Sequence, residues 1–335
     1  MTGPKAPIRW GIVGTANIAR AAFLPGLREA GGVAAAVAGR EAARTERYAT
    51  DNGIDRAIEG YQNLIDDPGV DALYLALPNS LHAEWALRAL EAGKPLLCEK
   101  PLCGNLGDTV KVLDAARQTG TLLWEAFVFP FHGQIARIRD LVAGGAIGEL
   151  MEIKSNFHFR AGNPANIRYS RELEGGALND VGCYPIRLAA EFFGVPHQAA
   201  WAGATWGGDS VDVDTWGVLE YPAGRRLHLS AGLGRGYDTY SSLEGTAGRI
   251  CLSNPFHPGA TDYYQVIAPR AEPVRYPAAA REASFTPAVR HINAVLAGEE
   301  EPRLLAVDTA LATARALHDL SESFTARARL ARGAA

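Results

Sequence analysis

The chain has 335 residues, of which 47% are hydrophobic and 21% are charged, and its formal net charge is −4. These values are typical of a globular protein that is long enough for two hydrophobic cores, and they do not favour nucleic acid as a partner. No apolar run approaches the roughly 20 residues that span a bilayer, so we expect no membrane partner. The opening segment lacks the apolar region of a secretory signal, so we expect a cytoplasmic protein.

The residues before about position 127 alternate short apolar runs with amphipathic, helix-like stretches, which is the order of a β-α-β fold. The expected strands are IRWGIVG (8–14), VAAAVAG (33–39), ALYLALP (72–78), PLLCEKP (95–101) and TLLWEAF (121–127). Strands without polar alternation are typical of a parallel sheet that helices cover on both faces. We therefore predict an α/β Rossmann domain with a doubly wound parallel sheet over residues 1–127.

The second part of the chain has longer strand-like segments with polar alternation, and a hairpin turn at YPAGRR. The clearest segments are 151–160, 215–233 and 248–252. A helical stretch over 179–194 interrupts them, and two helices close the chain. The pattern predicts an α+β domain over 128–335 with a large open, mostly antiparallel sheet. The apolar alternation of its strands leaves one sheet face that a dimer contact would cover.

A glycine-containing loop follows the first strand and leads directly into helical sequence. The loop residues are Gly14, Thr15, Ala16, Asn17 and Ile18. With Ala19 they form a G-x-A-x-x-A version of the dinucleotide-binding fingerprint, in which glycine allows the tight turn. The unpaired N–H groups of the helix would bind the pyrophosphate. The alternative is an ordinary strand-to-helix turn.

The end of the second strand indicates which dinucleotide is bound. NAD-binding proteins usually carry an acidic residue here for the ribose 2′-hydroxyl, but this chain has Gly39 and Arg40, with Arg44 one helical turn later. A guanidinium can bind a 2′-phosphate with two hydrogen bonds, so we predict NADP(H) over NAD(H). Glu41 could still bind a ribose, and NAD(H) remains possible.

Two further segments, LPNSLH (77–82) and CEKP (98–101), lie at the carboxyl ends of expected strands, where ligands collect in an open α/β sheet. The candidate cofactor contacts there are Leu77, Pro78, Asn79, His82, Glu99 and Lys100. Lys100 is unusual because it lies between apolar residues and is followed by proline. A lysine buried near a cofactor can take part in acid–base chemistry.

The segment GGALNDVGCYPI (175–186) holds the second group of candidates. Asp180 and Tyr184 are four residues apart, so on a regular helix both side chains would reach the same face. Each could simply be structural, as a helix cap and a packed tyrosine. Together with Lys100, they could supply a proton donor, a charge that tunes it and a carboxylate that orients substrate hydroxyl groups.

The motifs named above, with AGR (38–40) and WEAFVFPFH (124–132), occur in the order and spacing of the Gfo/Idh/MocA family of oxidoreductases, which the sequence resembles over nearly its whole length. The tyrosine at 184 and the EAF segment resemble the branch of dihydrodiol dehydrogenases, D-xylose dehydrogenases and deoxysugar 3-ketoreductases. The resemblance implies that Lys100 lies beside the nicotinamide ribose and that Tyr184 exchanges the proton.

The same resemblance implies that Asp180 binds a substrate hydroxyl group and that Trp124 and Arg168 line the substrate site. It also implies NADP contacts from the Gly14 loop, Arg40 and Arg44. The resemblance further implies that residues 128–335 bind the substrate and form a homodimer, or a dimer of dimers, through their open sheet.

The function expected from these features is hydride transfer between a nicotinamide and a carbon of a sugar or cyclic diol. The alternatives are a nucleotide-linked keto-sugar reductase of natural-product biosynthesis, NAD-assisted glycoside cleavage and a non-catalytic dinucleotide sensor. Retention of both Lys100 and Tyr184 argues against the sensor.

Other polar residues give no metal-binding pattern. The histidines lack paired ligand spacing, and alternation places Asp212 and Asp214 on an exposed strand face, so we expect no metal. The cysteines form no CxxC pair, which favours reduced thiols. They are Cys98, Cys103, Cys183 and Cys251.

Overall fold

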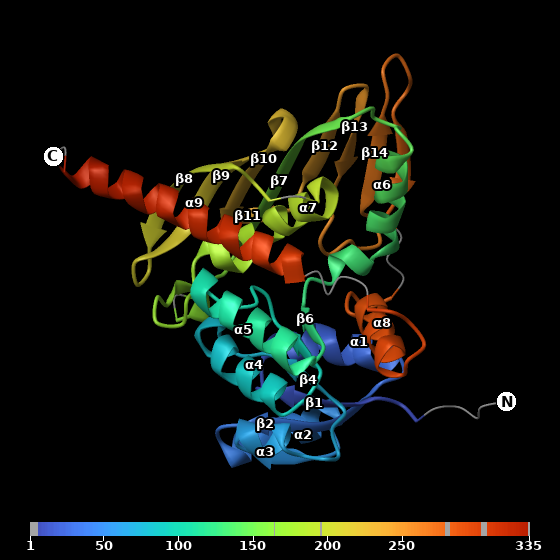
Figure 1. Ribbon diagram of the computed structural model, residues 1–335, viewed down its shortest axis with the longest axis vertical. Helices are drawn as coiled ribbons and strands as arrows, with labels where there is room; N and C mark the ends of the chain where they lie inside the picture. The colour runs from blue at the N-terminus through green and yellow to red at the C-terminus, as the bar shows by residue number, and fades with distance from the viewer. Residues whose placement is uncertain (1–5, 164, 195, 279–281, 303–306, 334–335) are drawn as a thin grey trace. The chain divides into compact units, whose positions relative to one another are not determined.

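The computed structural model describes residues 6–163, 165–194, 196–278, 282–302 and 307–333. The chain forms two compact units, each built on one sheet (Figure 1). The first unit comprises Met1–Cys103, Gly107–Val128 and Glu282–Val307, and the second comprises Gly104–Leu106, Phe129–Arg281 and Asp308–Ala335. The predicted fold classes of both parts, an α/β Rossmann domain and an α+β domain, are confirmed.

The sheet of the first unit has six parallel strands in the order β3-β2-β1-β4-β5-β6. The strands are β1 (Arg9–Val13), β2 (Val33–Gly39), β3 (Ala57–Glu59), β4 (Ala72–Leu75), β5 (Leu96–Cys98) and β6 (Leu123–Glu125). Chain order reverses between β1 and β4, and such a switch point is where open α/β sheets bind ligands. The short strand β3 was not predicted, because three residues carry too little periodicity.

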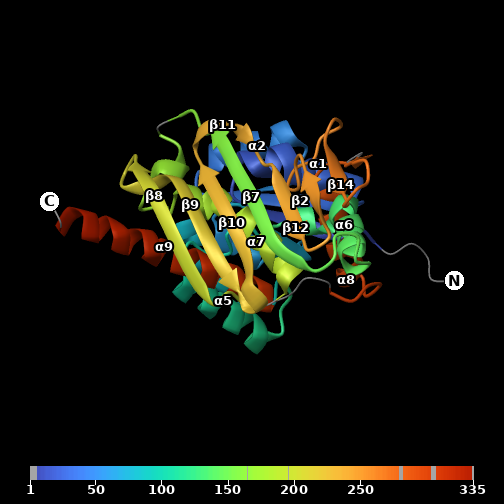
Figure 2. The same ribbon diagram turned by 90° about the horizontal axis from the view of Figure 1, so that it is seen from above.

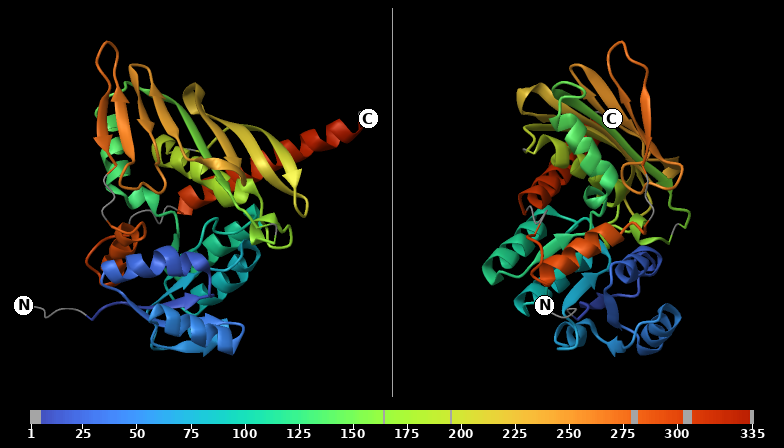
Figure 3. Two further views of the ribbon diagram at one scale, coloured as in Figure 1. Left: turned by 180° about the vertical axis from the view of Figure 1, so that it is seen from behind. Right: turned by 90° about the vertical axis from the view of Figure 1, so that its right-hand side faces the viewer.

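Helices accompany these strands, and one of them comes from late in the chain. They are α1 (Leu24–Glu29), α2 (Ala42–Asn52), α3 (Tyr61–Ile65), α4 (His82–Glu91), α5 (Leu106–Thr119) and α8 (Thr286–Leu296). Helix α8 lies beside α1 (Figure 3). A Cβ atom on Gly26 would be 2.7 Å from the Cβ of Phe285, so the two segments are in close contact. The Trp10 indole N–H also donates to the Asn293 side chain at 2.9 Å.

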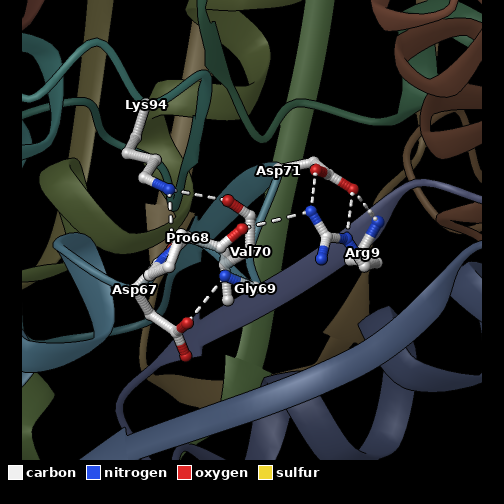
Figure 4. Close-up of polar contacts among 7 residues, drawn as sticks. All are labelled: Arg9, Asp67, Pro68, Gly69, Val70, Asp71 and Lys94. Carbon is white, nitrogen blue, oxygen red and sulfur yellow. Dashed lines mark hydrogen bonds and ion pairs between the residues drawn. The ribbon is translucent and has the colours of Figure 1, made fainter.

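The loop before β4 is held by charged side chains at the amino ends of β1 and β4 (Figure 4). The Arg9 guanidinium donates to both Asp71 carboxylate oxygens, at 2.7 and 3.0 Å. The Lys94 ammonium donates to the carbonyl oxygens of Asp67 and Val70, at 2.8 and 2.7 Å. These groups bind one another and stabilise the loop, while the predicted site lies at the opposite, carboxyl edge of the sheet.

The second unit has a nine-stranded mixed sheet in the order β15-β14-β13-β12-β7-β10-β9-β8, with β11 paired to β7. The strands are β7 (Leu150–Arg160), β8 (Ala199–Gly207), β9 (Val211–Tyr221), β10 (Arg225–Gly232), β11 (Gly234–Asp238), β12 (Ser241–Gly245), β13 (Gly248–Leu252), β14 (Tyr263–Ile267) and β15 (Val274–Pro277). Among the described strands of this sheet, only β7 and β10 pair in parallel. The predicted YPAGRR hairpin is confirmed between β9 and β10.

Helices α7 (Cys183–Phe193) and α9 (Val307–Gly333) cover one face of this sheet (Figure 2). A Cβ atom on Gly217 would be 2.7 Å from the Leu320 side chain, which shows how closely α9 approaches β9. Trp201 and Trp216 come from the opposite face and are 49% and 47% exposed. That face therefore carries large apolar side chains in contact with solvent. No helix among the described residues combines the length and apolar character needed to cross a bilayer.

Candidate active site

The Gly14 loop has the geometry that the fingerprint requires. Gly14 has a φ of 101°, and a Cβ atom there would be 2.6 Å from the carbonyl oxygen of Ala76. Its N–H donates to the carbonyl of Ala38 at 2.9 Å. Only glycine fits this position, because an L side chain rarely adopts this φ and would overlap β4. Thr15 and Ala16 are half-buried, and Asn17 and Ile18 are exposed.

The helix after this loop begins at Asn17 and Ile18 and continues as a π-helical turn over Ala19–Phe23, which has no side-chain cap. The loop is held from α2, where the Tyr48 hydroxyl donates to the carbonyl of Ala16 at 3.0 Å. Burial raises the pKa of Tyr48 to about 12, so it remains a donor at neutral pH. Sequence reasoning missed Tyr48, although it follows Arg44 by one turn on the same helix.

The end of β2 contains the features that predict NADP(H). A Cβ atom on Gly39 would be 2.2 Å from the Thr45 hydroxyl, so the strand and α2 meet without room for a side chain. Arg40 and Arg44 are both exposed. Glu41 is exposed too, and its carbonyl oxygen accepts a hydrogen bond from Thr45. The two guanidinium groups are therefore accessible at the carboxyl end of β2.

His82 joins the ends of β4 and β5. Its side chain is completely buried, with Nε2 2.9 Å from the carbonyl oxygen of Leu77 and Nδ1 3.0 Å from that of Pro101. Burial is the main cause that lowers the pKa of His82. The predicted cofactor contact is thus an enclosed side chain that supports the segments on either side. Leu77, Pro78 and Asn79 are half-buried.

The segment that carries Lys100 is held by buried acids. The Tyr74 hydroxyl donates to Glu99 at 2.5 Å, and Glu99 is only 9% exposed. The backbone N–H of Leu102 donates to Glu125 at 2.8 Å. The Lys100 side chain, between these anchored neighbours, is half-buried. Glu99 therefore supports this segment through Tyr74, a contact that the sequence did not indicate.

Trp124 lies on β6 and is 3% exposed. Its indole N–H is buried and has no hydrogen-bond partner among the residues that the structure describes. A buried donor without a partner is costly, so this group could donate to a bound molecule.

In the second unit, the structure brings together Arg168 and Asp180, the two residues of this unit that the resemblance implies contact the substrate with Tyr184. The Arg168 guanidinium donates through Nε to Asp180 at 2.5 Å. The same guanidinium lies 5.5 Å from the centre of the Phe159 ring. The result is an orientated carboxylate–guanidinium pair, which can accept from and donate to neighbouring hydroxyl groups.

Asp180 lies in a second π-helical turn, Leu178–Gly182, which leads into α7. Tyr184 follows it and is 7% exposed. Its ring lies among aromatic rings, with centroid distances of 4.9 Å to Phe157, 5.1 Å to Phe256 and 5.5 Å to His257. The expected helical stretch over 179–194 is present as this turn and α7, and the π turn at Asp180 changes its spacing from that of a regular α-helix. No sequence motif indicated His257.

The prediction that Asp212 lies on an exposed strand face is wrong, because the residue is buried. It is 8% exposed rather than on an open strand face, and its Oδ2 accepts from the N–H of Leu178 at 2.7 Å and from the Thr215 hydroxyl at 2.8 Å. The pairing of β8 with β9 shifts register between Thr205 and Trp206, which breaks the alternation that the prediction assumed. Among the described residues, no histidine, cysteine and acidic side chains cluster in a metal-binding group.

Comparisons with known proteins agree with this two-part arrangement. The family described as "Oxidoreductase family, NAD-binding Rossmann fold" matches residues 8–127, and the "GFO/IDH/MocA C-terminal domain" matches residues 135–251. The chain is 37% identical to a dTDP-3,4-didehydro-2,6-dideoxy-alpha-D-glucose 3-reductase of Saccharopolyspora spinosa, over 76% of this chain and 77% of that protein. It is 35% identical to D-xylose 1-dehydrogenase (NADP(+)) 2 of Haloferax volcanii, over 74% of this chain and 76% of that protein.

A solved structure is similar over almost the whole chain. It is a 3-ketoreductase from Actinomadura kijaniata in complex with NADP and TDP-benzene, with a TM-score of 0.86 and 32% sequence identity. The match covers 95% of this chain and 98% of that one.

Proposed function

The chain belongs to the Gfo/Idh/MocA family of oxidoreductases, and on that premise we propose that it transfers a hydride between NADP(H) and a carbon of a sugar-like substrate. In the reducing direction a carbonyl group, NADPH and a proton become an alcohol and NADP⁺. The observation that carries the proposal is the Arg168–Asp180 pair, since it offers a polar substrate both a donor and an acceptor within one unit.

The first unit fits the dinucleotide. The close approach at Gly14 leaves the backbone open to a pyrophosphate, and the helix that begins at Asn17 would present its first N–H groups and its positive end. Arg40 and Arg44 would bind the 2′-phosphate. NADPH, when bound, supplies the hydride.

We assign the remaining chemistry to the chain's own side chains. Tyr184 donates a proton to the carbonyl oxygen, and Lys100 stabilises the negative charge that this oxygen gains. Asp180 accepts from a neighbouring substrate hydroxyl group while Arg168 holds its carboxylate in place. The buried indole N–H of Trp124 supplies a further donor to the substrate.

The names of the relatives favour one class of substrate, a dTDP-linked keto-sugar reduced at C3. Four of these relatives, from four organisms, are dTDP-3,4-didehydro-2,6-dideoxy-alpha-D-glucose 3-reductases with 34–37% identity. The similar solved structure is a complex with NADP and TDP-benzene. A free aldose is the second candidate, because the D-xylose dehydrogenase is nearly as similar.

We also propose a homodimer, or a dimer of dimers, through the open face of the large sheet, in the cytoplasm. The exposed Trp201 and Trp216 on that face support the dimer, since large apolar side chains in contact with solvent mark association surfaces. All four cysteines are buried thiols, as expected in a reducing compartment.

The test follows absorbance of the reduced nicotinamide with NADPH and NADH against dTDP-linked keto-sugars, free aldoses and cyclic diols. We expect NADPH consumption with a dTDP-keto-sugar. Turnover with D-xylose and NADP⁺ alone would instead identify a sugar dehydrogenase. Cofactor binding without turnover on any compound would contradict the proposed activity and support a dinucleotide sensor.

A further inference from the structure

Asp212 is a buried acidic residue to which the proposed chemistry gives no role. It lies on β9, is 8% exposed and accepts hydrogen bonds from Leu178 and Thr215. Thr215 is completely buried beneath it. Burial raises the pKa of the Asp212 carboxyl, and these hydrogen bonds oppose the rise. Burying a carboxyl group destabilises the fold unless the group is hydrogen-bonded. The hydrogen bonds of Asp212 therefore indicate which part of the structure it supports.

The segment it holds is the glycine pair and the π turn that precede α7. The N–H of Leu178, the first residue of this turn, donates to Asp212 Oδ2 at 2.7 Å. Gly176 has a φ of 110°, and a Cβ atom there would be 2.2 Å from Asp212 Oδ1. The carboxylate is therefore in contact with the backbone of this segment on two sides, and only glycine leaves room for it.

The same backbone forms a closed ring with the Arg168–Asp180 pair. The N–H of Gly176 donates to the carbonyl of Arg168 at 2.8 Å, and the N–H of Asp180 donates to the carbonyl of Gly176 at 3.0 Å. The Arg168 guanidinium closes the ring by donating to the Asp180 carboxylate. Asp212 contacts this ring at Gly176 and at Leu178, between its two backbone hydrogen bonds.

We propose that Asp212 is a positioning residue for substrate binding: its carboxylate anchors the turn before α7 and thereby sets the direction in which Asp180 and Arg168 face the substrate. A carboxylate suits this role because it accepts several hydrogen bonds and has no donor that would repel a backbone N–H. Its negative charge also suits the start of a helix. The inference rests on the proposed function, because it takes Asp180 and Arg168 as substrate contacts.

The test compares Asp212→Asn with Asp214→Asn in the full-length protein. Both variants lose one negative charge from β9, but Asp214 pairs with Arg235 at the surface. With a dTDP-keto-sugar at saturating NADPH, we expect Asp212→Asn to raise KM and lower kcat/KM on the order of 10-fold to 100-fold, as misplaced binding groups do. The Kd for NADPH should stay within about twofold, because the dinucleotide contacts lie in the other unit.

Hydrogen exchange supplies a measurement that needs no substrate. Amides of residues 177–180 should exchange faster in Asp212→Asn, while those of β9 and the Rossmann sheet keep wild-type rates. Should Asp212→Asn fold poorly, Thr215→Val removes only one donor to the same carboxylate, and it should shift KM and the same amides in the same direction to a smaller extent.

The outcomes separate this inference from the proposed function. A wild-type protein without turnover would contradict the proposed function alone, because the exchange measurement would still test the anchor. Unchanged exchange at residues 177–180, or an equal loss of kcat/KM in Asp214→Asn, would overturn the role of Asp212. A loss of kcat/KM that only mirrors a smaller folded fraction would overturn it as well.

Discussion

Each unit contains a π-helical turn close to the start of a helix that follows glycine-containing sequence. The turn Ala19–Phe23 has no side-chain cap, whereas the turn Leu178–Gly182 receives the Asp212 carboxylate on its first N–H. The same local structure thus has two uses. An open helix start can accept an external anion, and one occupied by the protein's own carboxylate becomes a fixed support for the side chains that follow.

The largest effect on activity should come from substitution of Tyr184, which follows the turn Leu178–Gly182 that Asp212 holds. Tyr184→Phe removes the proposed proton donor and should lower kcat by about 10²–10⁴ while the Kd for NADPH is retained. Lys100→Met should lower kcat at least as much, and the double variant should lose far less than the product of the single losses, since the two groups act together. Single-turnover rates at saturating NADPH measure this. A Tyr184→Phe enzyme with near wild-type kcat would show that another group donates the proton.

The next largest effect concerns the binding of NADPH, whose 2′-phosphate Arg40 is proposed to contact. Arg40→Ala removes a charge-assisted contact and should weaken NADPH binding by about 1.5–3 kcal/mol, with NADH binding nearly unchanged. Arg47→Ala on the same helix, also exposed, is the matched control and should leave both affinities intact. Fluorescence titration of each cofactor gives the two constants. Equal losses for NADPH and NADH would rule out a 2′-phosphate contact.

A carboxylate beside the turn Ala19–Phe23 would make it resemble the turn Leu178–Gly182, which already has the Asp212 carboxylate on an N–H. Ile18 is 41% exposed, so Ile18→Asp should leave the core intact, and its charge near a helix start should stabilise the fold by about 0.3–1 kcal/mol. The same charge should repel the pyrophosphate by about 1 kcal/mol at 4 Å in water, which weakens NADPH roughly fivefold. Ile18→Asn controls for the changed shape. Unaltered NADPH affinity in the Asp variant would place the phosphates elsewhere.

The smallest effect is a pH dependence at His82. Because its folded pKa is lowered from 6.5, the unfolded chain binds the proton first as pH falls. The neutral His82 therefore contributes fully to the free energy of unfolding above about pH 6.5, and this contribution is lost as the pH falls toward the folded pKa. Between pH 7 and 6 the loss should not exceed about 0.7 kcal/mol. Urea unfolding of the wild type and of His82→Gln at both pH values measures the contribution of His82 to the free energy of unfolding. An identical change with pH in the two proteins would contradict a lowered pKa of the buried His82 imidazole.

Much of the first unit could be predicted from local sequence. Gly14 is required by its own backbone angle and by contact with the next strand, and the apolar runs that became β1, β2 and β4 needed no knowledge of distant partners. The short elements β3 and α3 were not predicted, because segments of three and five residues carry little periodicity. In the second unit, a motif identified Asp180 and Tyr184 and the family resemblance added Arg168, but the sequence did not predict their mutual geometry.

The sequence by itself determined the alternation of strands and helices, the family and the residue types of the site, because hydrophobic periodicity and glycine conformation are local properties. Only the tertiary structure decided that Asp212 lies buried beneath the turn at Leu178, that Arg168 binds Asp180, and that helix α8 lies against α1. The first depends on a register shift, the second on the path of the loop between Arg168 and Asp180, and the third on chain segments far apart in sequence. Such contacts arise when strands pair and layers pack, and no local pattern encodes them.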